Sequence, residues 1–153
     1  MKTLIICASR YGSTKVIGKW IAERLGFDST VADAESAPAP DGFDFLILGS
    51  GIYEDRVLPA LSNYIDNNFK TLDEKKKAFF GVCLDTKGFY LNGKIGGGWE
   101  YIRPLIDKFK NPPVYADILH GEINPSKLTP EDEKRLMIFY NKMLKRNYTS
   151  IPY

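Results

Sequence analysis

Three hydroxyl groups follow the first apolar run of the chain. Ser9, Ser13 and Thr14 come directly after Thr3–Ala8, which is predicted to be a buried strand, and a helical pattern follows them. The first N–H groups of a helix are unpaired and carry partial positive charge, so a strand, a hydroxyl-rich turn and a helix together form a phosphate site. The hydroxyls complete the hydrogen bonding without a cation. The segment Ser9–Thr14 therefore predicts a ligand that carries a phosphate.

Strand-like and helix-like patterns alternate along the whole chain, which predicts an α/β fold with a mostly parallel sheet and helices on both faces. The expected strands are Thr3–Ala8, Ser29–Ala32, Phe45–Leu48, Ala78–Leu84 and Val114–Leu119, and the expected helices are Ser13–Leu25, Pro59–Phe69, Trp99–Phe109 and a last one from Thr129. Ligands of such folds sit beyond the carboxyl ends of the strands, beside the first strand. Three loops reach that place: residues 9–14, 49–55 and 85–98.

Several local signals accompany these elements. Gly26 is expected to end the first helix and Thr129 to cap the last one. The basic run Lys75–Lys77 is interpreted as a solvated loop, and the glycine-rich segment Gly88–Gly98 as a mobile lid, a docking loop or a plain connector. The apolar faces are expected at Val16, Ile17, Trp20, Ile21 and Leu25 in the first helix and at Leu136, Phe139, Tyr140, Met143 and Leu144 in the last.

The composition is that of one globular domain, with 153 residues, 44% hydrophobic and 26% charged. No apolar stretch has the length of a membrane span, and the N-terminus lacks the pattern of a signal peptide.

Two separated cysteines predict buried free thiols in a reduced cytoplasm and make a zinc site improbable. The net charge of +2 is too mild to indicate nucleic-acid binding. His120 is expected to be structural, and no nucleophile–base pair supports hydrolytic chemistry.

The motifs that the chain lacks exclude several kinds of phosphate site. Neither the G-x-G-x-x-G of dinucleotide-binding turns nor the G-x-x-x-x-G-K-[ST] of P-loops is present. A phospho-acceptor receiver domain needs acidic residues after the first strand, where this chain has Cys7, Ala8 and Ser9. A monophosphate held by hydroxyls and amides fits the turn better.

The turn S-R-Y-G-S-T at Ser9–Thr14 resembles the FMN phosphate loop of flavodoxins, with Tyr11 in place of the usual small hydroxyl residue. The segment Gly49–Tyr53 is similar to the second flavin loop of that family. The resemblance is closest to the branch that includes the menaquinone-dependent protoporphyrinogen oxidases, through Phe79–Cys83 and Gly121–Leu128. It implies a flavodoxin-like three-layer sandwich, a five-stranded parallel sheet in the order 2-1-3-4-5, and FMN as the cofactor.

The resemblance also implies which residues hold the cofactor. The first loop would bind the phosphate, the second would lie along the isoalloxazine ring, and the third would supply amides and a hydroxyl to the pyrimidine edge. In the second loop, Gly51 would let a peptide carbonyl turn toward the reduced ring, and Tyr53 would stack on it. Lys87 would stabilise the reduced, anionic ring. The expected cofactor-binding residues are Ser9, Arg10, Tyr11, Gly12, Ser13, Thr14, Ser50, Gly51, Ile52, Tyr53, Leu84, Asp85, Thr86, Lys87 and Gly88.

Two functions agree with this reading. The first is a flavodoxin that carries electrons between partner proteins. The second is an FMN-dependent oxidoreductase that acts directly on a small molecule or quinone, in the manner of the protoporphyrinogen oxidases. The mildly basic charge disfavours a conventional flavodoxin, which is usually strongly acidic, and the short chain leaves little room for the basic insertion of those oxidases. A flavodoxin fold that no longer binds flavin is the third alternative.

Overall fold

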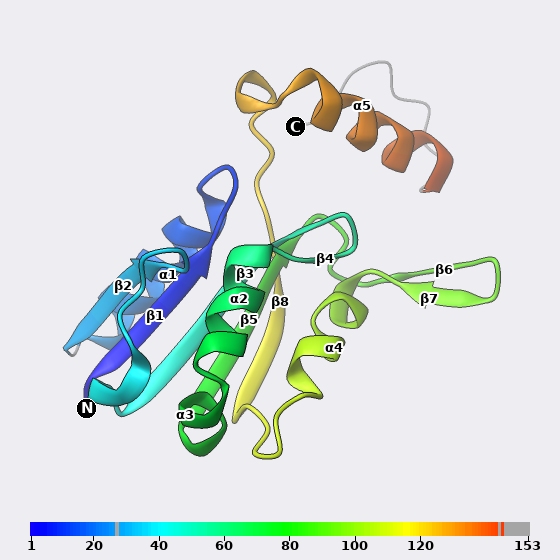
Figure 1. The fold of residues 1–153 in the computed structure, drawn as a ribbon. Coiled ribbons are helices and arrows are strands. Elements are labelled where there is room, and N and C mark those ends of the chain that lie inside the picture. Colours follow the sequence, from blue (N-terminus) through cyan, green and yellow to red (C-terminus); the bar gives the residue numbers. More distant parts are fainter. Residues whose placement is uncertain (27, 144, 146–153) are drawn as a thin grey trace. The chain divides into compact units, whose positions relative to one another are not determined.

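A parallel sheet organises the computed structural model, which describes residues 1–26, 28–143 and 145 (Figure 1). The chain divides into two compact units, residues 1–121 and 122–153, and each is described here by itself. The described residues contain no helix long and apolar enough to cross a membrane.

The sheet of the first unit has the strand order β2-β1-β3-β5-β8, and all neighbours on this path are parallel. The strands are β1 (Thr3–Ala8), β2 (Ser29–Asp33), β3 (Phe45–Tyr53), β5 (Lys76–Cys83) and β8 (Tyr115–His120). A short strand, β4 (Arg56–Val57), pairs antiparallel with the end of β3. The predicted order 2-1-3-4-5 of the parallel strands is therefore confirmed.

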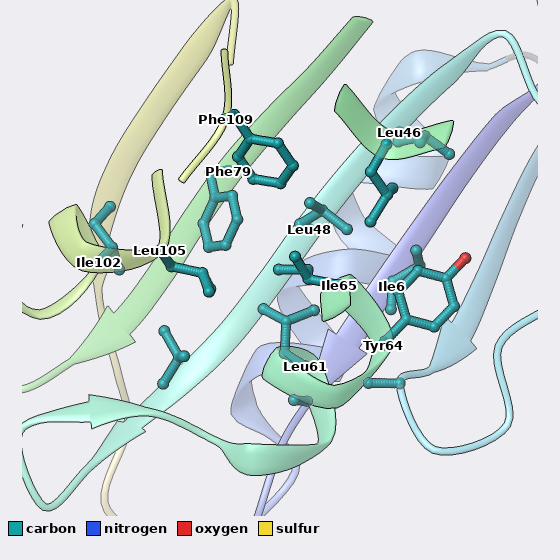
Figure 2. Packing of buried hydrophobic residues seen from close by; sticks show 14 of the residues in the cluster. Ile6, Leu46, Leu48, Leu61, Tyr64, Ile65, Phe79, Ile102, Leu105 and Phe109 are labelled. Atoms are coloured by element: carbon teal, nitrogen blue, oxygen red, sulfur yellow. The ribbon is translucent and has the colours of Figure 1, made fainter. Parts of the chain in front are cut away.

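Two apolar clusters cover the two faces of this sheet. Successive residues of a strand point to opposite faces, so Leu4 and Ile6 join one cluster while Ile5 and Cys7 join the other. The first cluster packs against the helices α2 (Pro59–Asn67), α3 (Phe69–Glu74) and α4 (Arg103–Ile106), as Figure 2 shows for Leu61, Ile65 and Leu105. The second packs against α1 (Ser13–Leu25).

Helix α1 approaches the sheet through its small residues. Ile17, Ile21 and Leu25 pack on the sheet as predicted, but Val16 is 44% exposed and Trp20 is 61% exposed. Gly18 is buried instead, and a Cβ built on it would lie 2.5 Å from Cys7 Sγ. The predicted apolar face was therefore wrong at Val16 and Trp20. Gly26 ends the helix in the left-handed conformation, as expected.

The segment after β5 differs most from the prediction. A two-stranded hairpin, β6 (Phe89–Leu91) and β7 (Lys94–Gly96), occupies the glycine-rich stretch that was interpreted as a lid or connector. The expected helix over Trp99–Phe109 is a 3₁₀ turn, η2 (Gly98–Tyr101), followed by the four-residue α4. Pro104 lies in the first turn of α4, a position that proline tolerates because the N–H it lacks has no partner there.

The basic run was also predicted wrongly, because it is not a solvated loop. Lys76 and Lys77 belong to β5, and Lys77 is only 1% exposed. Its Nζ donates hydrogen bonds to the carbonyls of Lys75, at 3.2 Å, and Asp73, at 3.3 Å, and lies 4.6 Å from the centre of the Phe109 ring. Burial lowers the pKa of Lys77 below its ordinary value, and the nearby Asp73 opposes this shift.

This lowered pKa makes stability depend on pH. Above the folded-state pKa the folded protein has released a proton that the unfolded chain still holds, so stability rises with pH up to the ordinary lysine pKa. We expect wild type to gain stability relative to Lys77→Met over this alkaline interval, measured as the free energy of unfolding in urea. Lys76→Met, at the exposed neighbouring position, is the control. If wild type gained as much stability relative to Lys76→Met as relative to Lys77→Met, the lowered pKa of Lys77 would not be the cause.

Two short turns and one helix make up the part of the second unit that the structure describes. The 3₁₀ turn η3 (Pro125–Lys127) precedes α5 (Pro130–Ile138), and a π-helical turn, η4 (Phe139–Met143), continues it. The Thr129 Oγ1 accepts a hydrogen bond from the Asp132 N–H at 3.2 Å, which confirms the predicted cap. Leu144, expected on the apolar face, lies outside the described residues.

Candidate functional site

The first loop joins β1 to α1 and leaves the start of the helix open. Gly12 occupies the N-cap position with φ 103° and ψ −17°, and as a glycine it offers no side-chain cap of its own. The Gly12 N–H donates instead to the Ser9 Oγ at 2.9 Å. A Cβ built on Gly12 would meet nothing within 4 Å, so the space beside this residue is open. Such a turn could act as a cradle for a phosphate, because N–H groups at a helix start bind anions.

The second loop is largely the end of a strand. Ser50, Gly51, Ile52 and Tyr53, expected after the third strand, are its last residues, because β3 continues to Tyr53. Ser50 is fully buried; its Oγ donates to the Gly51 carbonyl at 2.7 Å and accepts from the Leu58 N–H at 2.9 Å. This hydroxyl therefore fixes the shape of the loop from within.

The first two loops lie against each other. Ala8 is the register partner of Ser50 at the ends of β1 and β3. A Cβ on Gly51 would stand 3.4 Å from the Oγ1 of the buried Thr14 and 3.1 Å from the Tyr53 ring. A side chain at position 51 would therefore press on both the first loop and Tyr53, so the glycine permits this close approach.

An aromatic pair and one cation connect the same two loops. The Tyr11 and Tyr53 ring centres are 6.1 Å apart, with the ring planes tilted by 48°. The Arg10 guanidinium carbon lies 5.6 Å from each ring centre. Guanidinium groups are attracted to aromatic faces at this distance. Arg10, Tyr11 and Tyr53, which the sequence assigned to two separate loops, therefore form one cluster.

The turn after Tyr53 is a feature that the sequence analysis missed. Glu54 and Asp55 both have positive φ, at 50° and 62°, which is unusual for residues other than glycine. The Tyr101 side chain of η2 lies near the Asp55 carboxylate. Burial raises the pKa of Tyr101 above its ordinary value, and Asp55 raises it further. Because Tyr101 is distant in sequence, no local pattern signalled this contact.

The third loop is folded tightly on itself. The Gly98 N–H donates to the Asp85 carbonyl at 2.8 Å, and the Gly88 N–H donates to the Asp85 Oδ1 at 3.1 Å. A Cβ on Gly98 would stand 2.9 Å from the Thr86 carbonyl oxygen. Leu84 and Thr86 are half-buried and Lys87 is exposed.

One carboxylate oxygen in the third loop has no partner. The Asp85 Oδ2 is buried and accepts no hydrogen bond. Such an atom is costly to bury unless a donor reaches it. The atom packs against Gly97, where a Cβ would stand 2.5 Å from it, so the Asp85 carboxylate faces the inside of the loop.

A cavity of about 380 Å³ lies beside the first loop. Its lining includes expected site residues, Ser9 and Arg10, and three residues from the end of β2 that the sequence analysis did not single out: Asp33, Ala34 and Glu35. Asp33 is held by Lys15 of α1, with Nζ and Oδ2 2.7 Å apart. The residues at the carboxyl end of β2 therefore lie beside the first loop, as the doubly wound topology would have allowed us to predict.

Other side chains that could do chemistry are structural or peripheral. Cys7 and Cys83 are free and buried, as predicted, and burial raises their pKa values to about 12 and about 11. His120 ends β8, with Nδ1 2.9 Å from the Gly121 carbonyl oxygen. The described residues contain no group of three or more histidine, cysteine or carboxylate side chains arranged to hold a metal ion.

Comparisons with known proteins agree with this geometry. A family model described as a flavodoxin domain matches residues 4–150. The fold is similar to that of oxidised flavodoxin 1 from Bacillus cereus, at 20% identity and a TM-score of 0.58, with 97% of this chain and 100% of that chain covered. It is also similar to a flavodoxin from the domain Archaea, at 19% identity, a TM-score of 0.57 and coverage of 95% and 100%.

A flavoprotein in complex with FMN from Lactobacillus acidophilus is a further structural neighbour, at 12% identity, a TM-score of 0.52 and coverage of 78% of this chain and 90% of that one. At these identities the three likenesses establish the fold alone. The search of curated proteins finds no match.

Proposed function

Because the chain belongs to the flavodoxin-domain family, we propose that it binds FMN and carries electrons between partner proteins. The observation that supports this most is the open start of α1 behind Gly12, directly beside the second loop. It offers a phosphate site next to a surface on which a flat ring can lie.

The proposed contacts follow the three loops. The backbone amides from Arg10 to Thr14, with the hydroxyls of Ser9, Ser13 and Thr14, would hold the phosphate. The second loop, through Ser50, Gly51, Ile52 and Tyr53, would lie along the ring. The third loop, through Leu84, Asp85, Thr86, Lys87 and Gly88, would hold the pyrimidine edge. When bound, FMN supplies reversible one- and two-electron chemistry that the side chains of the chain do not.

Ser50 restrains the second loop against a change of backbone conformation when a ligand binds. Its hydroxyl holds the Gly51 carbonyl at 2.7 Å, so turning this carbonyl toward a ligand would break a buried hydrogen bond. A net hydrogen bond of this kind contributes about 1 kcal/mol. The chain therefore has a built-in resistance to reorienting the Gly51 peptide.

An FMN-binding experiment tests the proposal. We expect the purified protein to take up FMN in a ratio of one to one, measured by quenching of flavin fluorescence. A reductive titration should then give two well-separated one-electron potentials, as a carrier requires. Direct two-electron reduction with turnover of a quinone or a porphyrinogen would instead support the oxidoreductase alternative. A protein that takes up no FMN would contradict both.

A further inference from the structure

Arg10 lies in the loop expected to hold the phosphate, yet its side chain reaches the second loop. Its guanidinium is equidistant from Tyr11 and Tyr53, at 5.6 Å from each ring centre. Tyr11 is its neighbour in the chain, but Tyr53 comes from the end of β3. The guanidinium therefore lies between an aromatic ring of the first loop and one of the second.

Tyr53 carries this contact to the strip of backbone along which a ring would lie. The Tyr53 ring approaches Gly51 so closely that a Cβ there would be 3.1 Å from it. The Tyr53 ring thus lies close to both the Arg10 guanidinium and Gly51. A planar, weakly hydrated guanidinium is suited to stacking on aromatic faces, whereas a phosphate in the cradle needs only the amides and hydroxyls already described.

We propose that Arg10 serves the ring of the flavin and not its phosphate. This inference rests on the proposed function, since it concerns the same site. The guanidinium, held by Tyr11 and Tyr53, places a permanent positive charge beside the ring. It attracts the negative charge that the ring gains when it accepts electrons from an external donor.

Comparison of FMN with riboflavin tests this assignment, because riboflavin has the same ring and lacks the phosphate. We expect Arg10→Ala to weaken both ligands by the same factor, about three- to thirtyfold, because each would lose the same cation–π contact between the guanidinium and its ring. The dissociation constants are measured by flavin fluorescence. Arg24→Ala, which removes the same charge from the exposed far end of α1, is the matched control and should change neither.

A second readout separates a ring contact from a general loosening of the loop. With dithionite as the electron donor, the midpoint potential of bound FMN should become more negative in Arg10→Ala and return toward the wild-type value in Arg10→Lys, which restores the charge. If Arg10→Ala does not fold, Arg10→Gln removes the charge with a planar side chain and gives the same comparison.

The outcomes are distinct. An Arg10→Ala loss at least tenfold larger for FMN than for riboflavin would make Arg10 a phosphate ligand and overturn the inference while leaving the proposed function intact. Unchanged affinities, or an unchanged potential, would also overturn it. Failure of the wild-type protein to bind either flavin would overturn the proposed function itself.

Discussion

Gly12→Ala is expected to weaken FMN binding by roughly tenfold to a thousandfold while the protein still folds. At φ 103° and ψ −17° the residue has a conformation that an alanine adopts only with strain, although no atom lies within 4 Å of its Cβ position. Relaxing the strain turns the amides at the start of α1 away from the phosphate. One charge-assisted hydrogen bond of about 1.5–3 kcal/mol, or two of about 2 kcal/mol each, account for the expected factor.

Gly26→Ala is the matched control at the other end of the same helix. Gly26 also has positive φ, at 61°, and open space around its Cβ position, but it lies far from the candidate site. Both variants should lose about 1–2 kcal/mol of stability in urea unfolding, and only Gly12→Ala should lose FMN affinity. Equal affinities in the two variants would show that the start of α1 does not hold the phosphate.

Gly98→Ala is expected to open the third loop. The new Cβ would stand 2.9 Å from the Thr86 carbonyl oxygen and 3.2 Å from the Gly88 nitrogen, and both are backbone atoms that cannot rotate away. The strain at φ 51° adds to this clash. We expect a loss of about 2–5 kcal/mol, seen as a fall in the melting temperature of roughly 4–20 °C. FMN and riboflavin should weaken together, since this loop would hold the ring edge.

Gly93→Ala separates the clash from the strain. Gly93 lies at the tip of the hairpin with φ 78°, and the nearest atom to its Cβ position is the Tyr90 hydroxyl oxygen at 4.0 Å. Only the strain of about 1–2 kcal/mol should remain, and flavin affinity should be preserved. A Gly93→Ala variant that melts as low as Gly98→Ala would contradict the role given to the packing of the third loop.

The central strands could be predicted because burial alone specifies them. Every residue of β1 is buried, so its sequence is an uninterrupted apolar run apart from Thr3. The same reasoning failed for helix α1, where hydrophobicity at Val16 and Trp20 suggested contact. Close packing there depends on a glycine, which an apolar pattern does not register. Lys77 was missed for a related reason: its long aliphatic stem can lie in the sheet while its charged end finds carbonyls.

The turn of the hairpin has a recognisable sequence signal. Asn92 and Gly93 both have positive φ, as a two-residue hairpin turn requires, and the pair Asn-Gly is the usual sequence for such a turn. The other glycines of the segment make this pair hard to distinguish from a flexible loop. Pro104 likewise marked the interruption of the expected helix over Trp99–Phe109. The site itself was predictable only loop by loop, because the contacts of Arg10 with Tyr53 and of Asp55 with Tyr101 form through the tertiary fold.

The two buried thiols report on two different openings of the fold. Their raised pKa values keep both protonated at neutral pH, and a thiol reagent attacks the thiolate, so reaction must wait until the site is exposed. Cys7 lies beneath Gly18 of α1, whereas the Cys83 Sγ donates to the Asp85 carbonyl in the third loop. The rate at which Cys7 is alkylated therefore measures how often α1 moves away from the sheet. The rate for Cys83 measures how often the third loop opens.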